Sequence, residues 1–375
     1  MITGGAGFIG SHLADFLLHK GHEIFVFDSL DPQVHHGRNL PPDYLSKQVK
    51  FIHGDVRNSE QLAESLQDID VVYHLAAAVG VAQSMYQVQK FIDVNSHGTA
   101  NLLDVLINKP NHVKKLIVAS SMSIYGEGSY NCPTCKKIVN PKVRQFVTEK
   151  TKNWEYSCPI CQNKLIPFPT RENKPADCST VYALSKKEQE DLCMMIGKTY
   201  GLNTTALRFF GTYGSRQALS NPYTGVCAIF STALLSNNRP IVYEDGNQSR
   251  DLIHVKDIVQ ALTLSMERSE SKHEIFNVGT GKTVSISEVA TILSKALGKK
   301  IHPEISYKFR SGDVRHICAD ISKISEKLGF KPQYSFSEGI SELIPWIKEK
   351  FILNGGNIVD NSVKAKLELE KKGLI

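Results

Sequence analysis

The chain has no apolar run approaching the ~18 residues that a membrane-spanning helix requires. Its first residues lack the basic segment of a secretory signal peptide, and neither an internal repeat nor a low-complexity tract is present. Hydrophobic residues make up 41% of the 375 positions and charged residues 22%, which is ordinary for a globular protein and argues against a disordered or fibrous chain. We therefore expect a cytoplasmic protein of about two domains without a membrane partner.

A strong charge imbalance is also absent. The 44 basic residues outnumber the 38 acidic ones by six, which is too small a surplus to predict nucleic-acid binding. Nine of the basic and three of the acidic residues lie between positions 132 and 174, so the surplus belongs to this segment and the rest of the chain is balanced. We expect this local positive charge to attract an anionic small molecule.

Short β-rich runs alternate with helical patterns in the first 125 residues, which predicts βαβ units and a buried parallel sheet. A helix at 181–200 and a strand at 204–209 resume this alternation after an interruption rich in Cys and Pro. Only three residues precede the first glycine, so either the true start lies upstream, which we favour, or the first strand is clipped. The other expected strands are 23–27, 49–53, 71–75 and 115–120, and the other expected helices are 8–19, 60–66 and 91–107.

A glycine-rich loop follows the first expected strand and opens the first expected helix. Gly4 permits a tight turn, Gly7 lets the backbone approach a pyrophosphate, and Gly10 lets helix and strand pack closely. The helix N-terminus offers free N–H groups to phosphates. Asp28 suits a ribose 2′-hydroxyl and would repel a 2′-phosphate, so the pattern favours NAD over NADP, and Asp55 is expected to border the adenine. A glycine turn without a ligand is the alternative.

Tyr182 and Lys186 are four residues apart in an expected helix and therefore share one face of it. An ammonium group beside a phenol lowers the phenol pKa from about 10 and makes it a usable base near neutral pH. Because this spacing is common, an ordinary amphipathic surface pair is the alternative.

Four of the eight cysteines form two Cys-Pro-x-Cys pairs, Cys132 with Cys135 and Cys158 with Cys161. Two such pairs at this distance predict a closed zinc ribbon in which all four ligands are cysteines and the metal is structural, and iron is an alternative to zinc. A redox pair and unliganded thiols are the other interpretations. No ligand position is left open, which argues against a catalytic metal.

These patterns together predict an α/β protein with a doubly wound parallel Rossmann sheet, a smaller C-terminal α+β substrate domain and an inserted zinc ribbon. The predicted division assigns 1–126 and 177–214 to the NAD-binding Rossmann domain, 127–176 to the ribbon insertion, 215–350 to the substrate domain and 351–375 to a polar C-terminal tail.

Seven motifs occur in order along the chain. They are T-G-G-A-G-F-I-G at 3–10, H-L-A-A at 74–77, S-S-M-S-I-Y-G at 120–126, Y-A-L-S-K at 182–186, R-D-L-I-H-V-K-D at 250–257, N-V-G-T-G at 277–281 and G-D-V-R at 312–315. With them the chain resembles the extended short-chain dehydrogenase/reductase family, and within it the NAD-dependent nucleotide-sugar epimerases and dehydratases. The resemblance covers about residues 1–350 and implies a homodimer that pairs helices 86–107 and 180–200.

The resemblance also implies roles for individual residues. Ser121 would hydrogen-bond the sugar hydroxyl that is oxidised, Tyr182 would take its proton while C4 gives hydride to the nicotinamide, and Lys186 would hold the nicotinamide ribose. Arg250 and Arg315 match arginines that grip the nucleotide's phosphates, although each alone is also compatible with a surface ion pair. The implied cofactor-binding residues are Gly4, Gly7, Phe8, Ile9, Gly10, Asp28, Asp55, Val56, Leu75, Ala76, Ala77, Tyr182 and Lys186, and the implied substrate-binding residues are Ser121, Ser123, Arg250 and Arg315.

Two sites depart from the family pattern. Members that remove water from the sugar carry Asp-Glu where this chain has Met122 and Ser123, neither of which is an acid or base near neutral pH. The remaining residues predict a 4-epimerase that oxidises C4, lets the keto-sugar rotate and reduces its other face. A reductase or decarboxylase on a UDP- or GDP-sugar is the nearer alternative, and a non-catalytic NAD sensor that binds nucleic acid is the remote one. Gly211 replaces an Asn that contacts the substrate phosphate, so nucleotide placement must differ locally.

The ribbon insertion separates Ser121 from Tyr182 by 61 residues, where the family usually has about two dozen. We therefore expect a lid or wall that shapes sugar specificity, with a remote stabilising or subunit-contact module as the alternative. A ribbon at this place, together with Trp154-Glu155 and the segments 28–35 and 221–225, resembles the subgroup described as dTDP-L-rhamnose 4-epimerases. This predicts conversion of dTDP-L-rhamnose to dTDP-6-deoxy-L-talose as the leading reaction.

Overall fold

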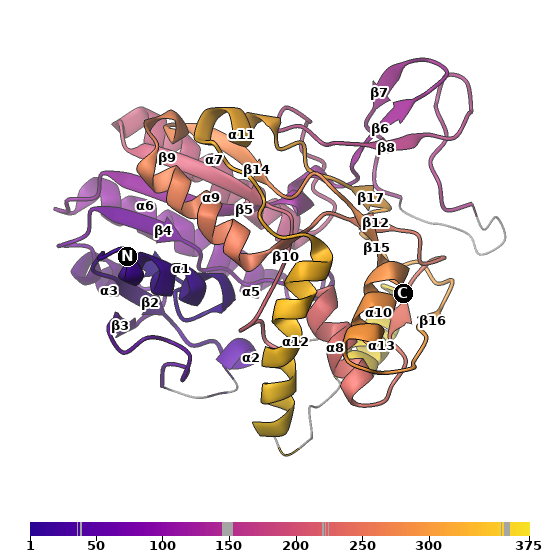
Figure 1. Cartoon of the computed structure of the whole chain (residues 1–375). Helices are drawn as coiled ribbons and strands as arrows, with labels where there is room; N and C mark the ends of the chain where they lie inside the picture. Colours follow the sequence, from indigo (N-terminus) through magenta and orange to yellow (C-terminus); the bar gives the residue numbers. More distant parts are fainter. Residues whose placement is uncertain are drawn as a thin grey trace.

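A computed structural model of the chain shows a parallel sheet covered by helices on both faces, as the sequence predicts (Figure 1). The structure describes residues 1–35, 37, 40–144, 153–219, 221, 223, 225–353, 355 and 361–375. None of the helices within these ranges is both long and apolar enough to cross a membrane.

The central sheet has seven parallel strands in the order β14-β9-β5-β4-β1-β2-β3. The chain runs outward from β1 through β2 and β3, then returns to β4 and continues in the opposite direction. This creates a topological switch point between β1 and β4, and ligands of such sheets bind there, beyond the carboxyl ends of the strands. The bounds are Ile2–Thr3 (β1), Phe25–Asp28 (β2), Lys50–His53 (β3), Val71–His74 (β4), Lys115–Ser121 (β5), Asn203–Phe209 (β9) and Glu274–Val278 (β14).

The predicted strands after the first glycine loop are confirmed, with ends that differ by no more than two residues. Every residue of β5 is buried, including Leu116, Ile117 and Val118. A parallel strand with helices on both faces needs apolar residues such as these, because neither of its faces meets water. The hydrophobic pattern of the sequence was therefore enough to predict this central strand.

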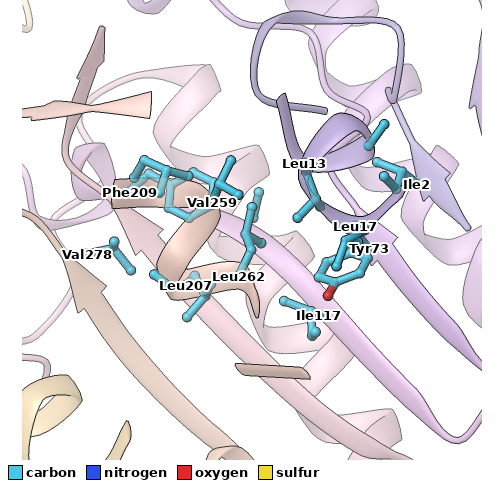
Figure 2. Packing of buried hydrophobic residues seen from close by; sticks show 14 of the residues in the cluster. Ile2, Leu13, Leu17, Tyr73, Ile117, Leu207, Phe209, Val259, Leu262 and Val278 are labelled. Carbon is cyan, nitrogen blue, oxygen red and sulfur yellow. The ribbon is translucent and has the colours of Figure 1, made fainter. Parts of the chain in front are cut away.

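Helices pack on both faces of the sheet. On one face, Leu13 and Leu17 of α1 and Leu262 of α9 lie against Ile117 and Leu207 of the strands, as Figure 2 shows. Burying each such side chain stabilises the fold by about 1.5–3 kcal/mol. This face carries α1 (Phe8–His19), α9 (Val255–Glu267) and α11 (Ser322–Leu328), and the other carries α3 (Ser59–Ser65), α6 (Gly98–Asn108) and α7 (Val181–Tyr200).

The predicted helix at 91–107 is divided in the structure. Its first part is a π-helical segment, η1 (Ile92–His97), and its second part is α6. The Asn95 side chain of η1 is fully buried, accepts a hydrogen bond from the Ala78 amide at 2.7 Å and donates to Ser185 at 2.9 Å. Short connecting helices are α2 (Pro32–His35), α4 (Val81–Ser84), α5 (Val88–Phe91), η2 (Met122–Tyr125) and η3 (Ser269–Ser271).

A second, smaller unit packs beside the carboxyl ends of the strands (Figure 1). Its core lies between three helices and contains Leu234, Leu293 and Ile340. The helices are α8 (Val226–Leu235), α10 (Ile286–Ala296) and α12 (Phe336–Leu353). Its strands are β10 (Gly211–Tyr213), β11 (Ile241–Val242), β12 (Ser249–Arg250), β13 (Leu252–His254), β15 (Val284–Ser285), β16 (Glu304–Ile305) and β17 (His316–Ile317).

The predicted boundary at residue 214 does not describe this arrangement. Strand β14 and helices α9 and α11 come from the range 215–350, yet they extend and cover the central sheet. The chain therefore crosses between the two units more than once. The sequence did not indicate this, because an element's period does not reveal which of two sheets it joins.

The insertion forms a three-stranded antiparallel sheet in the order β7-β6-β8, which projects from the body of the molecule (Figure 1). Its base is fixed to the segment around β17, where the Thr170 amide donates to the Cys318 carbonyl at 2.8 Å and the Gly128 amide donates to the His316 carbonyl at 3.1 Å. The strands are β6 (Ser129–Cys132), β7 (Lys137–Val139) and β8 (Ile166–Phe168).

The predicted polar tail contains an ordered helix, α13 (Ser362–Lys371). Although its sequence is mostly charged, Ala365 and Leu369 are buried, with only 5% and 4% of their surface exposed. The helix is attached to the smaller unit through hydrogen bonds from Tyr223 to Glu368 and from Lys308 to Glu370.

Candidate active site

A cavity of about 650 Å³ runs from the carboxyl ends of the central strands into the smaller unit. All thirteen predicted cofactor residues line it, as do Ser121, Ser123 and Arg250. Arg315 does not. The sequence therefore placed most of the predicted residues at one site, and Arg315 is the exception.

The glycine loop forms the floor of this cavity at the start of α1. Gly4 has a positive φ of 69°, which favours glycine, and its amide donates to the Phe27 carbonyl at 2.8 Å. A Cβ on Gly10 would lie 2.5 Å from the Gly4 carbonyl oxygen, so only glycine allows helix and loop to pack this closely. No side chain caps α1 at Gly7, and the first amides of the helix are therefore available to an anion.

Asp28 and Asp55 stand at the ends of β2 and β3, as predicted. The Asp28 carboxylate accepts the amides of Ala6 at 2.9 Å and Leu30 at 2.8 Å, so it also ties the glycine loop to β2. Burial raises the pKa of Asp28 against the effect of these hydrogen bonds. Arg57, which belongs to the same segment expected to border the adenine, binds both oxygens of Asp55 at 2.9 and 2.6 Å and holds the pKa of that carboxyl below its usual range.

Ser121 and Tyr182 approach each other from different elements. Ser121 ends β5 and its hydroxyl accepts the Ser123 amide at 3.2 Å and the Ser123 hydroxyl at 2.9 Å. Tyr182 lies in the first turn of α7, where the Thr180 side chain caps the helix by accepting the Ala183 amide at 3.2 Å. Burial raises the pKa of Tyr182, and a hydrogen bond with Ser121 partly opposes this.

Lys186 is buried one turn further along α7, and burial lowers its pKa to about 8. Its ammonium donates to the Gln189 side chain at 2.6 Å. Gln189 in turn donates to Thr99 at 2.8 Å, and Thr99 lies 3.0 Å from His74. Burial lowers the pKa of His74 to about 3, so its imidazole is neutral near pH 7 and Lys186 is the positively charged group of this network. Gln189 is on the same helix as Lys186, but Thr99 and His74 come from α6 and β4, so spacing along one helix did not predict them.

Two arginines face the cavity from the smaller unit. Arg250 binds Asp313 at 2.8 Å and the Val314 carbonyl at 2.6 Å, and Arg310 binds the other oxygen of Asp313 at 3.0 Å. Burial opposes the ionised form of Asp313, but the charges of Arg310 and Arg250 keep its pKa low. Arg310 was missed, although it stands only two residues before the G-D-V-R motif.

Arg315 points away from the cavity, contrary to the predicted phosphate contact. Its side chain is fully buried and binds Glu155 at 2.6 Å, Asp245 at 2.6 Å and Glu244 at 2.9 Å. Arg315 lies in the loop directly before β17, and the turn of that loop directs its side chain toward these carboxylates instead of the cavity. Glu155 belongs to the insertion, and Arg315 therefore joins the ribbon to the body.

The chain matches two family models. Residues 1–150 match the NAD dependent epimerase/dehydratase family, and residues 164–343 match GDP-mannose 4,6 dehydratase. A dTDP-L-rhamnose 4-epimerase of Burkholderia thailandensis is 30% identical over 352 residues, which cover 93% of this chain and 95% of the relative. The chain belongs to the NAD-dependent epimerase/dehydratase family. This confirms the predicted extended short-chain dehydrogenase/reductase relationship.

Solved structures of the family share the fold. The UDP-glucose 4-epimerase of Thermotoga maritima, determined with UDP-glucose, aligns with a TM-score of 0.75 at 28% identity and covers 93% of this chain and 98% of its own. The Thermus thermophilus UDP-glucose 4-epimerase, determined with NAD, aligns at 0.72 and 28% identity, covering 92% and 98%. NAD is therefore the cofactor that the family assigns to this cavity, and the glycine loop and Asp28 fit it.

The two departures from the family pattern lie on the cavity wall. Met122 and Ser123 line the cavity beside Ser121, and neither supplies a carboxyl group. Gly211 also lines it, in β10 beside Leu252 of β13. A Cβ at Gly211 would lie 2.7 Å from the Leu252 side chain, so a larger residue would require this contact to shift.

The four cysteines of the two Cys-Pro-x-Cys pairs come together at one end of the insertion. All four Sγ atoms lie within 4.8 Å of one another, with Cys132 3.5 Å from Cys161 and Cys135 3.9 Å from Cys158. A tetrahedral zinc with ~2.3 Å bonds to sulfur sets its ligands about 3.8 Å apart. The donor set therefore fits a closed metal site.

The expected lid is not seen. None of the described insertion residues, 127–144 and 153–176, lines the cavity. Residues 145–152, which the expectation also includes, lie outside the described part of the chain. The ribbon instead contacts the segment around Arg315, on the outer side of the cavity wall.

Proposed function

We propose that this chain is an NAD-dependent nucleotide-sugar 4-epimerase. The observation that carries the proposal is the convergence of Ser121, Tyr182 and Lys186 on a cavity that also contains the glycine loop. The absence of a carboxyl pair at Met122 and Ser123 disfavours removal of water from the sugar. With NAD as the hydride carrier, oxidation and reduction at one carbon require from the protein only a group that moves the hydroxyl proton.

In the proposed reaction, Ser121 orients the sugar 4-hydroxyl and Tyr182 removes its proton. Lys186, one turn further along α7, would hold the cofactor ribose with its buried ammonium. When bound, NAD supplies the hydride acceptor and a cationic ring at the site. A positive charge at the site would favour the phenolate of Tyr182, whose pKa burial raises against the effect of the Ser121 hydrogen bond.

Arg250 and Arg310 are the proposed diphosphate-binding residues. Both guanidinium groups line the cavity, and they share a single carboxylate, Asp313. Their wall therefore keeps a net positive charge that suits an anionic nucleotide sugar. Arg310 takes the place that the sequence analysis assigned to Arg315.

Within this class, dTDP-L-rhamnose is the proposed substrate and dTDP-6-deoxy-L-talose the product. The support is the 30% identical dTDP-L-rhamnose 4-epimerase, together with the subgroup pattern in the sequence. NMR analysis of products from a panel of dTDP-, UDP- and GDP-sugars tests both levels of the proposal. Epimerisation of a UDP-sugar alone would refute the substrate, and no epimerisation of any sugar would refute the reaction. Stoichiometric oxidation of added NADH would identify a reductase instead.

We also propose one structural zinc per chain and a homodimer. The zinc proposal rests on the closed four-cysteine cluster, and metal analysis of the purified protein tests it against iron.

The dimer proposal rests on exposed apolar side chains on α5 and α7, where Val88, Leu184 and Met195 are 48%, 46% and 62% exposed. Light scattering gives the mass in solution, and a monomer would refute the dimer.

A further inference from the structure

Helix α13 forms part of the cavity wall, although it lies beyond both stretches that match the family models, 1–150 and 164–343. Ala365, Lys366 and Leu369 all line the cavity. The family relationship therefore provides no role for this helix, and its position at the site has to be explained from its own contacts.

The inner face of α13 is apolar and narrow. Ala365 and Leu369 are four residues apart on one face of the helix, and both are buried. Val363 and Leu367 on the outer side are 50% and 61% exposed. The helix thus packs by one stripe, and that stripe faces the cavity.

Contacts on both sides of α13 attach it to two rims of the cavity, one at Tyr223 and one at Arg310. On one side, the Tyr223 hydroxyl donates to Glu368 at 2.6 Å, and the Lys372 ammonium lies 5.9 Å from the Tyr86 ring. On the other side, the Lys308 ammonium donates to Glu370 at 2.9 Å. The Ser311 amide donates to the Leu374 carbonyl at 3.0 Å, which fixes the chain after the helix to the loop that carries Arg310. The helix therefore bridges the two rims.

Lys366 brings a further positive charge to this wall. No ion pair within the described residues includes Lys366, although its charge acts on Glu370 one turn along the helix. Arg250 and Arg310 share one carboxylate on the adjacent loop. An ammonium group that lines the same cavity is suited to an anionic ligand.

We propose that α13 belongs to the substrate site, with Lys366 as a binding residue for the diphosphate of the nucleotide sugar and Leu369 as an apolar wall beside it. This inference rests on the proposed function, because it takes a nucleoside diphosphate sugar as the ligand. It adds a specificity-determining element that comes from outside the matched family region.

The test is direct binding of UDP and dTDP to the purified NAD-loaded full-length protein by calorimetry, followed by KM measurements with the accepted sugar. Lys366→Met keeps the length of the side chain and removes its charge. We expect it to weaken diphosphate binding about tenfold or more, the loss typical of one charge-assisted contact. Lys364→Met is the matched control, because Lys364 is exposed on the same helix and does not line the cavity. It is expected to bind within twofold of the unmodified protein.

A second pair of variants tests the apolar wall. Leu369→Ser is expected to raise KM severalfold, whereas Leu367→Ser, at an exposed position, leaves it unchanged. If Lys366→Met and Leu369→Ser both bind and turn over like their controls, the role of α13 is refuted. If the unmodified protein binds neither diphosphate and converts no sugar, the proposed function fails, and the inference fails with it. Circular dichroism of each variant shows whether the helix is retained, and the charge variant remains informative if Leu369→Ser unfolds it.

Discussion

Replacing Arg315 with methionine is expected to destabilise the fold and leave substrate binding intact. The fully buried guanidinium binds three carboxylates, those of Glu155, Glu244 and Asp245. Arg144 also binds Glu244 at 2.6 Å, so one of the three keeps a cationic partner in the variant. Glu155 and Asp245 lose theirs, apart from the His316 ring 3.2 Å from Glu155. Removing one partner of a fully buried ion pair costs about 3–5 kcal/mol, and we expect a loss toward the lower end of that range because the Glu155 and Asp245 side chains are 20% and 24% exposed.

The expected loss depends on pH in a defined direction. Against burial, hydrogen bonds from His316 and Arg315 lower the pKa of Glu155 to about 2, and Arg315 and Asn247 lower that of Asp245 to about 2. A carboxyl group with a lowered pKa stabilises the fold above its unfolded pKa of about 4, and this contribution disappears as the pH falls toward 2. The difference between the unmodified protein and Arg315→Met is therefore largest near pH 7 and shrinks below pH 4.

Urea-induced unfolding at pH 7, 5 and 3.5 measures this difference. In a Trp346→Phe background, which removes the second tryptophan, the fluorescence of Trp154, which is buried in the insertion next to Glu155, reports the ribbon. Arg171→Met is the control, since the Arg171 side chain is 69% exposed in its pair with Asp320 and such pairs contribute about 0–1 kcal/mol. A loss below about 1 kcal/mol at pH 7, or a tenfold rise in KM at unchanged stability, would refute the structural role of Arg315.

Three further predictions concern the cavity and the ribbon. Arg310→Met should raise the KM for the sugar nucleotide about tenfold or more through the loss of one charge-assisted phosphate contact, and a KM within twofold would contradict its proposed role. Tyr182→Phe should lower kcat by about 10²- to 10⁴-fold while the protein still retains NAD on purification, as absorbance and steady-state assays would show. Chelation at neutral pH should release one zinc per chain and make the cysteines of the four-cysteine cluster reactive to a thiol reagent, and unreactive thiols after metal loss would contradict a metal-held ribbon.

The sheet and the cofactor loop could be predicted from the sequence because their determinants are local. The buried run of β5 and the glycines at 4, 7 and 10 each carry their own structural requirement, and the structure adds only the order of the strands. The proposed catalytic residues needed one more step, because Ser121 and Tyr182 are separated by the insertion. The family motifs assigned both residues to one site. The hydrogen bonds that link Lys186, Gln189 and Thr99 were not predicted from the sequence.

The arginines show where such prediction fails. Arg310 and Arg315 flank the same G-D pair, and both are plausible phosphate ligands by composition. Whether each points inward depends on how the loop before β17 turns, and no local pattern encodes that. The carboxylates that bind Arg315 come from positions 155, 244 and 245, so only the folded chain reveals that its charge is already neutralised.

The same contacts change the meaning of the positive charge in the insertion. Arg144 binds Glu244, Arg171 binds Asp320 and Lys142 binds Asp177, so much of the surplus is directed at the protein's own carboxylates rather than at a ligand. Behind the cavity, the Arg315 carbonyl accepts a hydrogen bond from the guanidinium of Arg250 at 3.1 Å. The insertion therefore supports the proposed phosphate-binding wall from its outer side. A ribbon that is folded by its metal would hold Glu155 against Arg315, and through that backbone would fix the orientation of Arg250 toward the substrate.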